Sequence, residues 1–202
     1  MKKFKLNPEN PDIKLIYKAI DILKDDGVIL YPTDTIYGLG ANIFSDKGVR
    51  RIYEIKERST KKPLSVLVSN FDGLKLVAET EGKEEIIKNY LPGPYTFILR
   101  RKKIVPSIVT SYTSKVGVRI PDNKISRLLS INFPITTTSA NISNKEVMSN
   151  PKDIMKQLKK EVDLIIDVGE LKCKNPSTII DLTKKEPNII RKGKTLQDPP
   201  NV

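Results

Sequence analysis

The 202-residue sequence contains no histidine, and this absence excludes several classes of catalytic site. Ser-His-Asp and Cys-His catalysis, imidazole metal sites and histidine proton shuttles all need an imidazole group. Any chemistry must therefore depend on lysine, arginine, carboxylates, hydroxyls and backbone dipoles. A single cysteine, Cys173, excludes an internal disulfide and fits a reducing compartment.

Long apolar runs and the common nucleotide-binding motifs are also missing. No window approaches 18 apolar residues, and the N-terminus lacks the apolar segment of a signal peptide. We therefore expect a cytoplasmic protein that does not associate with a membrane. Neither GxGxxG nor GxxxxGK[ST] occurs, so the sequence supports neither a Rossmann nor a P-loop nucleotide site.

Positive charge is the most prominent feature that is present. The formal net charge of +12 predicts an anionic partner, namely nucleic acid, phosphate or carboxylate. A lysine-rich surface without any such partner is the alternative. The length suits one domain with a substantial core.

Local patterns predict a mixture of helices and strands. Asn10-Pro11 predicts a helix capped by Asn10 and ending at Gly27. Further helices are expected from Ser45 to about Glu57 and over residues 71–78, 83–90, 123–130 and 151–160. Strands are expected at residues 28–30, 64–68, 96–99, 116–121, 162–167, 178–182 and 188–191, from residue 135, and at the edge over residues 2–6. This order predicts a single α/β domain over residues 1–202, with a twisted mixed parallel and antiparallel sheet flanked by helices and an irregular tail from Lys192.

Residues 31–40, which read YPTDTIYGLG, are predicted to form the floor of an active site. Pro32 lacks a backbone donor, so the chain should leave the sheet there. The short hydroxyl side chains that follow can bind a small polar ligand without filling a pocket. Gly38 and Gly40 would then permit either positive φ or a close approach of the backbone. A strand that ends in a glycine turn is the alternative. Asp34 is a candidate general base by proximity alone, and we expect it instead to cap a helix or a turn.

Several apolar strands are followed by hydroxyls or cations. These residues are Thr33, Thr35, Lys56, Arg58, Arg119, Thr137, Ser139, Ser177 and Arg191. Ligands bind at strand ends along one edge of an open α/β sheet, so we expect these side chains to converge there. Converging arginines would hold carboxylates or phosphates through paired hydrogen bonds. Each residue taken singly could instead be a solvated charge or a turn-forming threonine.

Seven motifs carry a family resemblance over about residues 10–195. In chain order they are YPTDTIYGLG, Lys56-Glu57-Arg58, KPLS at 62–65, PGPYT at 92–96, VRIP at 118–121, TSAN at 138–141 and STII at 177–180. Together they resemble the YrdC family of threonylcarbamoyl-adenylate synthases. The resemblance implies a YrdC-like domain and a nucleotidyltransferase that forms L-threonylcarbamoyl-AMP and pyrophosphate from L-threonine, bicarbonate and ATP. A partner complex would then transfer the threonylcarbamoyl group to an adenosine beside the anticodon of certain tRNAs.

The same resemblance assigns expected roles to individual residues. It implies that Thr35, Arg119 and Ser177 bind threonine and that Lys56 and Arg58 are catalytic. The residues that it implies for nucleotide binding are Arg58, Lys62, Lys115, Thr137, Ser139, Asn141, Ser149 and Arg191. Mg²⁺ would arrive with the ATP substrate, since the sequence contains no dedicated metal site.

Departures from the family and two rival functions are also relevant. Lys62 and Leu67 stand where certain members carry Asn and His, and Lys115 replaces a Thr. The first rival is a double-stranded RNA-binding or tRNA-binding module without catalysis, although weak RNA contact could accompany the synthase activity. The second is a carbamoyl-transfer enzyme of the maturation-factor type, which resides in a much longer chain with zinc-finger cysteines.

Overall fold

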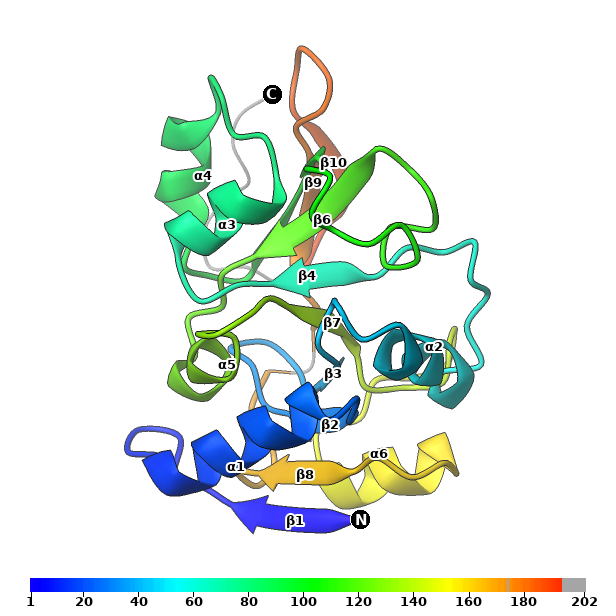
Figure 1. Cartoon of the computed structure of the whole chain (residues 1–202). Coiled ribbons are helices and arrows are strands. Elements are labelled where there is room, and N and C mark those ends of the chain that lie inside the picture. The colour runs from blue at the N-terminus through cyan, green and yellow to red at the C-terminus, as the bar shows by residue number, and fades with distance from the viewer. Residues whose placement is uncertain (174, 194–202) are drawn as a thin grey trace.

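The computed structural model describes residues 1–173 and 175–193 (Figure 1). Most of the predicted irregular tail, residues 194–202, lies outside the described residues. The described helices are α1 (Ile13–Lys24), α2 (Asp46–Ile55), α3 (Phe71–Val77), α4 (Glu84–Tyr90), α5 (Lys124–Leu129) and α6 (Pro151–Leu158). The described strands are β1 (Lys2–Lys5), β2 (Ile29–Tyr31), β3 (Gly38–Gly40), β4 (Ser65–Leu67), β5 (Tyr95–Arg100), β6 (Lys115–Arg119), β7 (Ile135–Ser139), β8 (Leu164–Asp167), β9 (Thr178–Asp181) and β10 (Asn188–Arg191).

All of these strands belong to one mixed sheet in the order β1-β8-β2-β3-β7-β4-β6-β5-β9-β10. β8 lies between β1 and β2 and is parallel to both, whereas β7 is antiparallel to both β3 and β4. At the other end, β5 is antiparallel to β6 and parallel to β9. The predicted α/β fold with a mixed sheet flanked by helices is therefore confirmed.

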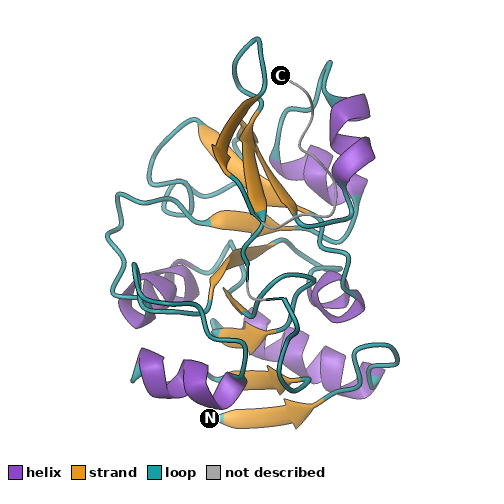
Figure 2. Ribbon diagram, turned by 180° about the vertical axis from the view of Figure 1, so that it is seen from behind, coloured by secondary structure: helices purple, strands orange, loops and turns teal. Residues whose placement is uncertain are grey.

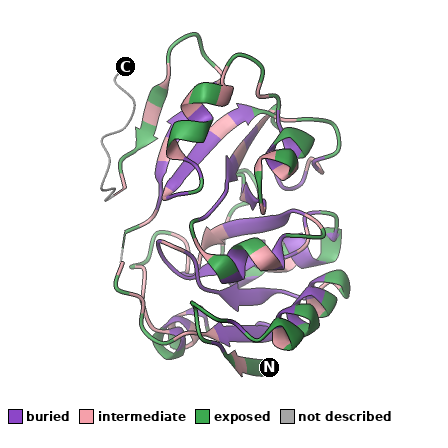
Figure 3. Ribbon diagram, turned by 90° about the vertical axis from the view of Figure 1, so that its left-hand side faces the viewer, coloured by how far each residue is buried: buried purple, intermediate pink, exposed green. Residues whose placement is uncertain are grey.

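Alternate side chains of the strands pack into two separate cores, one on each face of the sheet. In β2, Ile29 and Tyr31 pack with α1 and α5, whereas Leu30 packs in the core that includes α2, α3 and α6. β8 divides in the same way, since Leu164 joins the α1 and α5 core and Ile165 joins the other. This follows from the two-residue repeat of a strand. Figure 3 shows the inner strands of the sheet as the most continuously buried part of the molecule, whereas β1 and β10 at its two ends are mostly exposed, and Figure 2 shows helices on both sides of the sheet.

The start of α1 differs from the prediction. The N-cap is Asp12, whose carboxylate accepts a hydrogen bond of 2.8 Å from the amide of Lys14. The predicted cap, Asn10, was wrong by two residues because Asp12 has the extended backbone that a cap needs and a charged acceptor that suits the helix dipole.

The glycine pair of residues 31–40 forms a strand rather than a turn. β3 is buried between β2 and β7, and neither of its glycines has a positive φ. A Cβ atom on Gly40 would lie only 2.7 Å from the ring of Tyr31, so the close approach of the backbone accounts for this glycine. Among the described helices, none is both long enough and apolar enough to span a membrane.

Candidate active site

A cavity of about 650 Å³ lies against one face of the middle strands of the sheet. Its wall takes alternate residues from four strands, namely Ser65 of β4, Lys115, Gly117 and Arg119 of β6, Thr96 and Ile98 of β5, and Ile179 of β9, together with the consecutive residues Thr137, Thr138 and Ser139 of β7. Val66, Phe97, Val116, Val118 and Ile180, which alternate with them, pack in the core on the opposite face. The prediction of a site at the edge of the sheet was therefore wrong. Polar side chains on the alternate positions of paired strands instead form a polar face.

Gly117 provides the depth of this cavity. A Cβ atom at this position would lie 2.8 Å from the Oγ of Ser65 and 3.4 Å from Cγ2 of Thr96. The absence of a side chain therefore leaves space between β4 and β5. Lys115 and Arg119 extend from the same face of β6, one on either side of that space.

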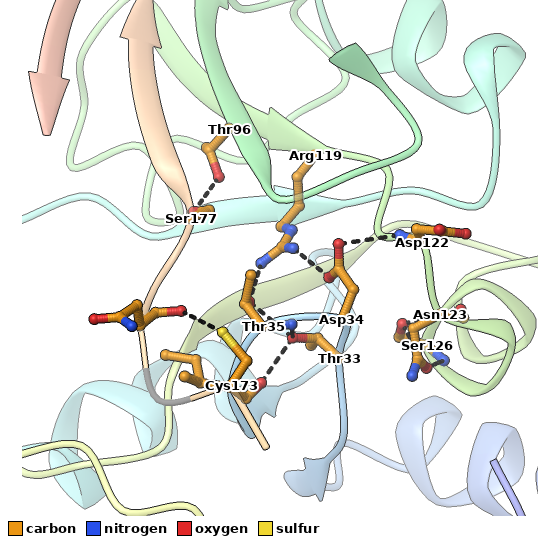
Figure 4. A network of polar contacts seen from close by, with 12 residues as sticks. Thr33, Asp34, Thr35, Thr96, Arg119, Asp122, Asn123, Ser126, Cys173 and Ser177 are labelled. Atoms are coloured by element: carbon orange, nitrogen blue, oxygen red, sulfur yellow. Dashed lines mark hydrogen bonds and ion pairs between the residues drawn. The ribbon is translucent and has the colours of Figure 1, made fainter. Parts of the chain in front are cut away.

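Arg119 is buried at the end of β6 and faces the loop between β2 and β3 (Figure 4). One terminal nitrogen lies 2.5 Å from Oδ1 of Asp34, and the other donates to Oγ1 of Thr35 at 3.2 Å. The Nε of Arg119 is buried and has no partner among the described residues. The guanidinium is thus held on one side and retains donor capacity on the other.

Asp34 does not cap a turn as predicted. Its second oxygen accepts a hydrogen bond of 3.2 Å from the amide of Asp122, so its carboxylate joins the 33–36 loop to the segment after β6. The turn is instead stabilised by Thr33, whose Oγ1 accepts from the amide of Thr35 and donates to the carbonyl of Ile36. Threonine hydroxyls form such local turns readily, which leaves the carboxylate free to pair with an arginine.

Ser177 lies on the other side of the cavity, before β9. Its hydroxyl is 2.8 Å from that of Thr96 on β5, and its carbonyl accepts hydrogen bonds of 3.2 and 2.8 Å from Arg191 of β10. Figure 4 shows the Thr96 and Ser177 pair beside the Arg119 side chain. Burial lowers the pKa of Arg191, and the positive charge of Arg119 lowers it further. Arg119 and Arg191 therefore line the same cavity, Arg119 buried and Arg191 more exposed.

A reversal of the chain after α2 separates two basic residues. The backbone of Glu57 is left-handed with φ of 48°, and the amide of Arg58 bonds to the carbonyl of Tyr53. Arg58 consequently reaches the cavity wall, where it donates to the carbonyls of Lys62 and Pro63 at 3.1 and 2.9 Å. Burial lowers the pKa of the Arg58 guanidinium.

Lys56, on the near side of that reversal, does not line the cavity but bonds to a residue that does. Only 1% of this residue is exposed, and its ammonium group donates to the carbonyls of Ser139 and Asn141 and to Oδ1 of Asn141. Burial, together with the charge of Arg58, lowers its pKa to about 7. Its own carbonyl accepts from the amide of Ser143 at 2.8 Å.

Most of the predicted site residues meet at this cavity. Its wall contains Thr35, Arg58, Lys62, Lys115, Arg119, Thr137, Ser139, Ser177 and Arg191. Lys56 and Asn141 lie behind the wall, and Ser149 is bonded instead to Glu170 at 2.8 Å. Leu67 is buried in the core with α1 and α5. Sequence reasoning missed Ser65, Thr96 and Gly117, although the alternation of polar and apolar residues in KVGVR at 115–119 indicated such a face.

The charges of the cavity are strongly one-sided. Six cationic side chains line it, and the described wall includes no carboxylate; the cations are Arg58, Lys61, Lys62, Lys115, Arg119 and Arg191. Two of them have partners behind the wall, since Arg119 pairs with Asp34 and Lys115 pairs with Asp181 at 3.0 Å. Among the described residues there is no cluster of three acidic, histidine or cysteine residues that could hold a metal ion. The cavity can therefore bind an anion through arginines and lysines.

Tyr37 joins the floor of the cavity to the segment after β8. Its hydroxyl donates to the carbonyl of Gly169 at 2.8 Å and accepts from the amide of Val168 at 3.1 Å. Burial is the main cause that raises the pKa of Tyr37 to about 12, so the hydroxyl stays protonated. The chain that leads from β8 to Ser177 is thereby anchored to β3.

Comparison with known proteins shows the family to which this chain belongs. The Sua5/YciO/YrdC family model, described as "Telomere recombination", matches residues 21–193. A Methanocaldococcus jannaschii protein provisionally named threonylcarbamoyl-AMP synthase is 40% identical over 194 residues, covering 96% of this chain and 92% of that protein. Escherichia coli YciO, whose name states no activity, is 35% identical over 195 residues, covering 94% of each protein.

Solved structures agree with the sequence comparison. The crystal structure of E. coli YciO matches with a TM-score of 0.89 and 34% identity over 96% of this chain and 97% of that one. Pyrococcus abyssi Sua5 in complex with L-threonine matches with a TM-score of 0.89 and 32% identity over 96% of this chain. The chain spans only 58% of the length of that Sua5 chain.

Proposed function

Because the chain belongs to the Sua5/YciO/YrdC family, we propose that it is an L-threonylcarbamoyladenylate synthase. Relatives with the synthase name are 30–40% identical over most of the chain, and one solved relative binds L-threonine. The substrates are L-threonine, bicarbonate and ATP, and the products are threonylcarbamoyl-AMP and pyrophosphate. Since the product serves tRNA modification, we assign the enzyme to the cytoplasm.

The observation that carries this proposal is the set of six cations around one cavity without a carboxylate on its described wall. A volume of about 650 Å³ is within the range of small-molecule sites and suits a ligand with several anionic groups. ATP contributes phosphates and threonine contributes a carboxylate, so both substrates complement the same charge. A nucleic-acid module without catalysis would not need a cavity lined by buried hydroxyls such as those of Thr35 and Ser177, because phosphate backbones can be bound by basic residues on the surface.

Threonine is assigned to the part of the cavity that contains Thr35, Arg119 and Ser177. The free side of the Arg119 guanidinium would hold the carboxylate, with its unpartnered Nε as one of the available donors. The hydroxyls of Thr35 and Ser177 would bind polar groups of threonine, since both are buried and close to the wall.

ATP is assigned to the remaining cations and hydroxyls of the wall. Arg58 and Lys62 would hold phosphates beside Thr137 and Ser139, with Lys115 and Arg191 supporting the nucleotide. Mg²⁺ would be supplied with ATP and would neutralise phosphate charge. The carboxylates of Asp34 and Asp181 are already paired with Arg119 and Lys115 of the wall.

The reaction needs no covalent enzyme intermediate, which suits a chain without histidine. The threonine amine attacks the carbon of CO₂ derived from bicarbonate: a C–N bond forms, one C=O π bond becomes the anionic carbamate oxygen, and the amine loses a proton to solvent. If bicarbonate reacts directly, its C–OH bond breaks and water leaves. A carbamate oxygen then attacks the α-phosphorus of ATP, and the bond from that phosphorus to the bridging oxygen breaks to release pyrophosphate. Arginines fixed by the fold would stabilise the negative charge and position both substrates.

The test is direct detection of the adenylate. Purified protein is incubated with ATP, Mg²⁺, bicarbonate and L-threonine, and threonylcarbamoyl-AMP is measured by mass spectrometry. Omission of either threonine or bicarbonate should abolish both the adenylate and pyrophosphate release. Pyrophosphate release that continues without threonine would contradict the assignment. Transfer to tRNA, which we assign to a separate partner complex, needs its own assay with tRNA present.

A further inference from the structure

Lys56 is the most completely buried cationic group near the cavity, and the wall as described does not include it. Three hydrogen bonds connect its ammonium group to residues 139 and 141, two of them to backbone carbonyls and one to the Asn141 side chain. An ammonium group has three donors, so these acceptors use its full capacity. In this arrangement no donor is left for a substrate.

The backbone of Lys56 holds the same segment from a second point. Its carbonyl accepts from the amide of Ser143, which lies in the turn that follows Asn141. Asn141 adds two further contacts, since Oδ1 accepts from the hydroxyl of Ser139 at 2.6 Å and Nδ2 donates to the carbonyl of Lys145 at 2.6 Å. Lys56 and Asn141 therefore form one connected network that we call the 139–145 clamp.

The 139–145 clamp directly follows residues that line the cavity. Thr137, Thr138 and Ser139 line the wall just before the clamped turn. Their positions depend on where the chain leaves β7, and this exit is fixed by the bonds from Lys56. The only charge that perturbs the ammonium is that of Arg58 from the same end of α2, whereas its partners from residues 139–141 are uncharged oxygens.

We propose that Lys56 is a positioning residue, which holds the 139–145 clamp so that Ser139 and its neighbours face the nucleotide, and that it does not contact substrate. This inference rests on the proposed function for the identity of the nucleotide. It changes the role expected for Lys56 from the sequence, where it was grouped with Arg58 as catalytic. The two residues of the KxR motif diverge because Glu57 reverses the chain between them.

Hydrogen exchange tests the clamp without any assumption about activity. In Lys56→Met, amides of residues 140–145 should exchange roughly 10-fold faster, because the lost network is worth at least one buried hydrogen bond. Arg58→Met removes a cation from the same helix end, but Arg58 has no described hydrogen bond to residues 139–145 and loss of its charge favours the Lys56 ammonium, so exchange there should not become faster. Unchanged exchange in Lys56→Met would overturn the proposal. If Lys56→Met fails to fold, Lys56→Gln, which keeps two donors, is used in its place.

Affinity for ATP, measured by calorimetry, then separates positioning from direct contact. We expect Lys56→Met and Asn141→Ala each to weaken ATP binding roughly 10-fold, and the double variant to be no weaker than the worse single variant. The losses of ATP affinity in Arg58→Met and Asn141→Ala should instead multiply, so that the double variant binds ATP roughly 100-fold more weakly than wild type. Multiplying losses for Lys56 and Asn141 would indicate an independent substrate contact and overturn the proposal.

Threonine provides the internal control in the same experiment. Its affinity in Lys56→Met should stay within about 3-fold of wild type, because Thr35, Arg119 and Ser177 have no hydrogen bond to the clamp in the described structure. An equal loss of threonine and ATP affinity would indicate general damage and count against a role confined to the clamp. Failure of the wild-type protein to bind ATP would overturn the proposed function, and the exchange result alone would then decide the role of Lys56.

Discussion

Arg119 and Asp34, which are 85 residues apart in the sequence, form a buried ion pair with 2.5 Å between their closest atoms. The side chains are only 6% and 10% exposed. Because Asp34 lies behind the guanidinium, it orients Arg119 toward the cavity and at the same time neutralises part of its charge. The pair thus fixes the geometry of an anion site without occupying it.

Asp34→Asn tests this relationship. The amide can still accept from the Asp122 backbone but leaves Arg119 without a counter-charge, so the free energy of unfolding should fall by about 2–3 kcal/mol. L-threonine should raise the melting temperature of this variant more than that of wild type, because its carboxylate replaces the missing charge. Asp122→Asn removes an exposed charge nearby and should change neither quantity. Equal effects of the two variants would contradict an orienting role.

Arg119→Ala should weaken threonine binding or threonine-dependent turnover roughly 30-fold or more, which corresponds to about 2–5 kcal/mol for an unpaired buried carboxylate. The measurement is threonine-dependent formation of the adenylate. Lys156→Ala is the matched control, because it removes one positive charge from a side chain that is 69% exposed on α6. If both variants keep normal activity, Arg119 does not hold the substrate.

Gly40→Ala should destabilise the protein by about 1–3 kcal/mol, as expected for overpacking in a core. The added methyl group would meet the Tyr31 ring at 2.7 Å and the Thr136 carbonyl at 3.1 Å. Gly38→Ala provides a graded comparison, since its closest contact with the same ring is 3.1 Å and its cost should be smaller. Urea denaturation measures the stability of both variants. A larger loss of stability in Gly38→Ala than in Gly40→Ala would contradict the packing argument.

Lys56 should make stability depend on pH in a defined direction. Its pKa is about 7 in the folded protein and 10.5 ordinarily, so between these values the unfolded chain binds the extra proton. The stability of wild type relative to Lys56→Met should therefore rise from pH 7 toward pH 9, by at most about 1.4 kcal/mol per pH unit. Urea denaturation of both proteins gives this difference and cancels the other titrating groups. If the stability difference between the two proteins does not change with pH, the three oxygen partners of Lys56 offset the lowering of its pKa by burial.

Lys159→Gly should stabilise the protein by about 0.5–1 kcal/mol. Lys159 ends α6 with a left-handed backbone, φ 57°, which glycine adopts without steric cost. Lys156→Gly, within the same helix, should instead cost about 1 kcal/mol. Thermal or urea unfolding measures the stability of both variants. A Lys159→Gly variant that is less stable than wild type would contradict the prediction.

Local sequence patterns predicted the positions of the helices and most strands because hydrophobic periodicity depends on nearby residues. They also predicted that Arg119 would lie near other hydroxyls and cations, and the structure places it, buried, in the wall of the cavity with them. They did not predict the pairing of β6 with β4 and β5, which places Ser65 and Thr96 beside Gly117. Such pairings join distant segments, so their partners cannot be read from local periodicity.

The roles of Asp34 and Lys56 show the same limit. A carboxylate between two threonines has the local signature of a cap, and the expected catalytic role of Lys56 came from the family resemblance alone. Their actual partners, Arg119 and Asn141, lie 85 residues away in each case. Only the folded arrangement brings these groups into contact.

The pairing of β1 with β8 has a consequence for synthesis of the chain. Lys2 is paired with Leu164, about 160 residues later, and β2 is also paired with β8. At typical translation rates the ribosome needs on the order of 10–30 s to make the intervening segment. During that time the N-terminal strand and one edge of β2 have no native strand partner. The three lysines of β1 suit this unpaired interval, because lysine on an unpaired strand discourages pairing with another chain.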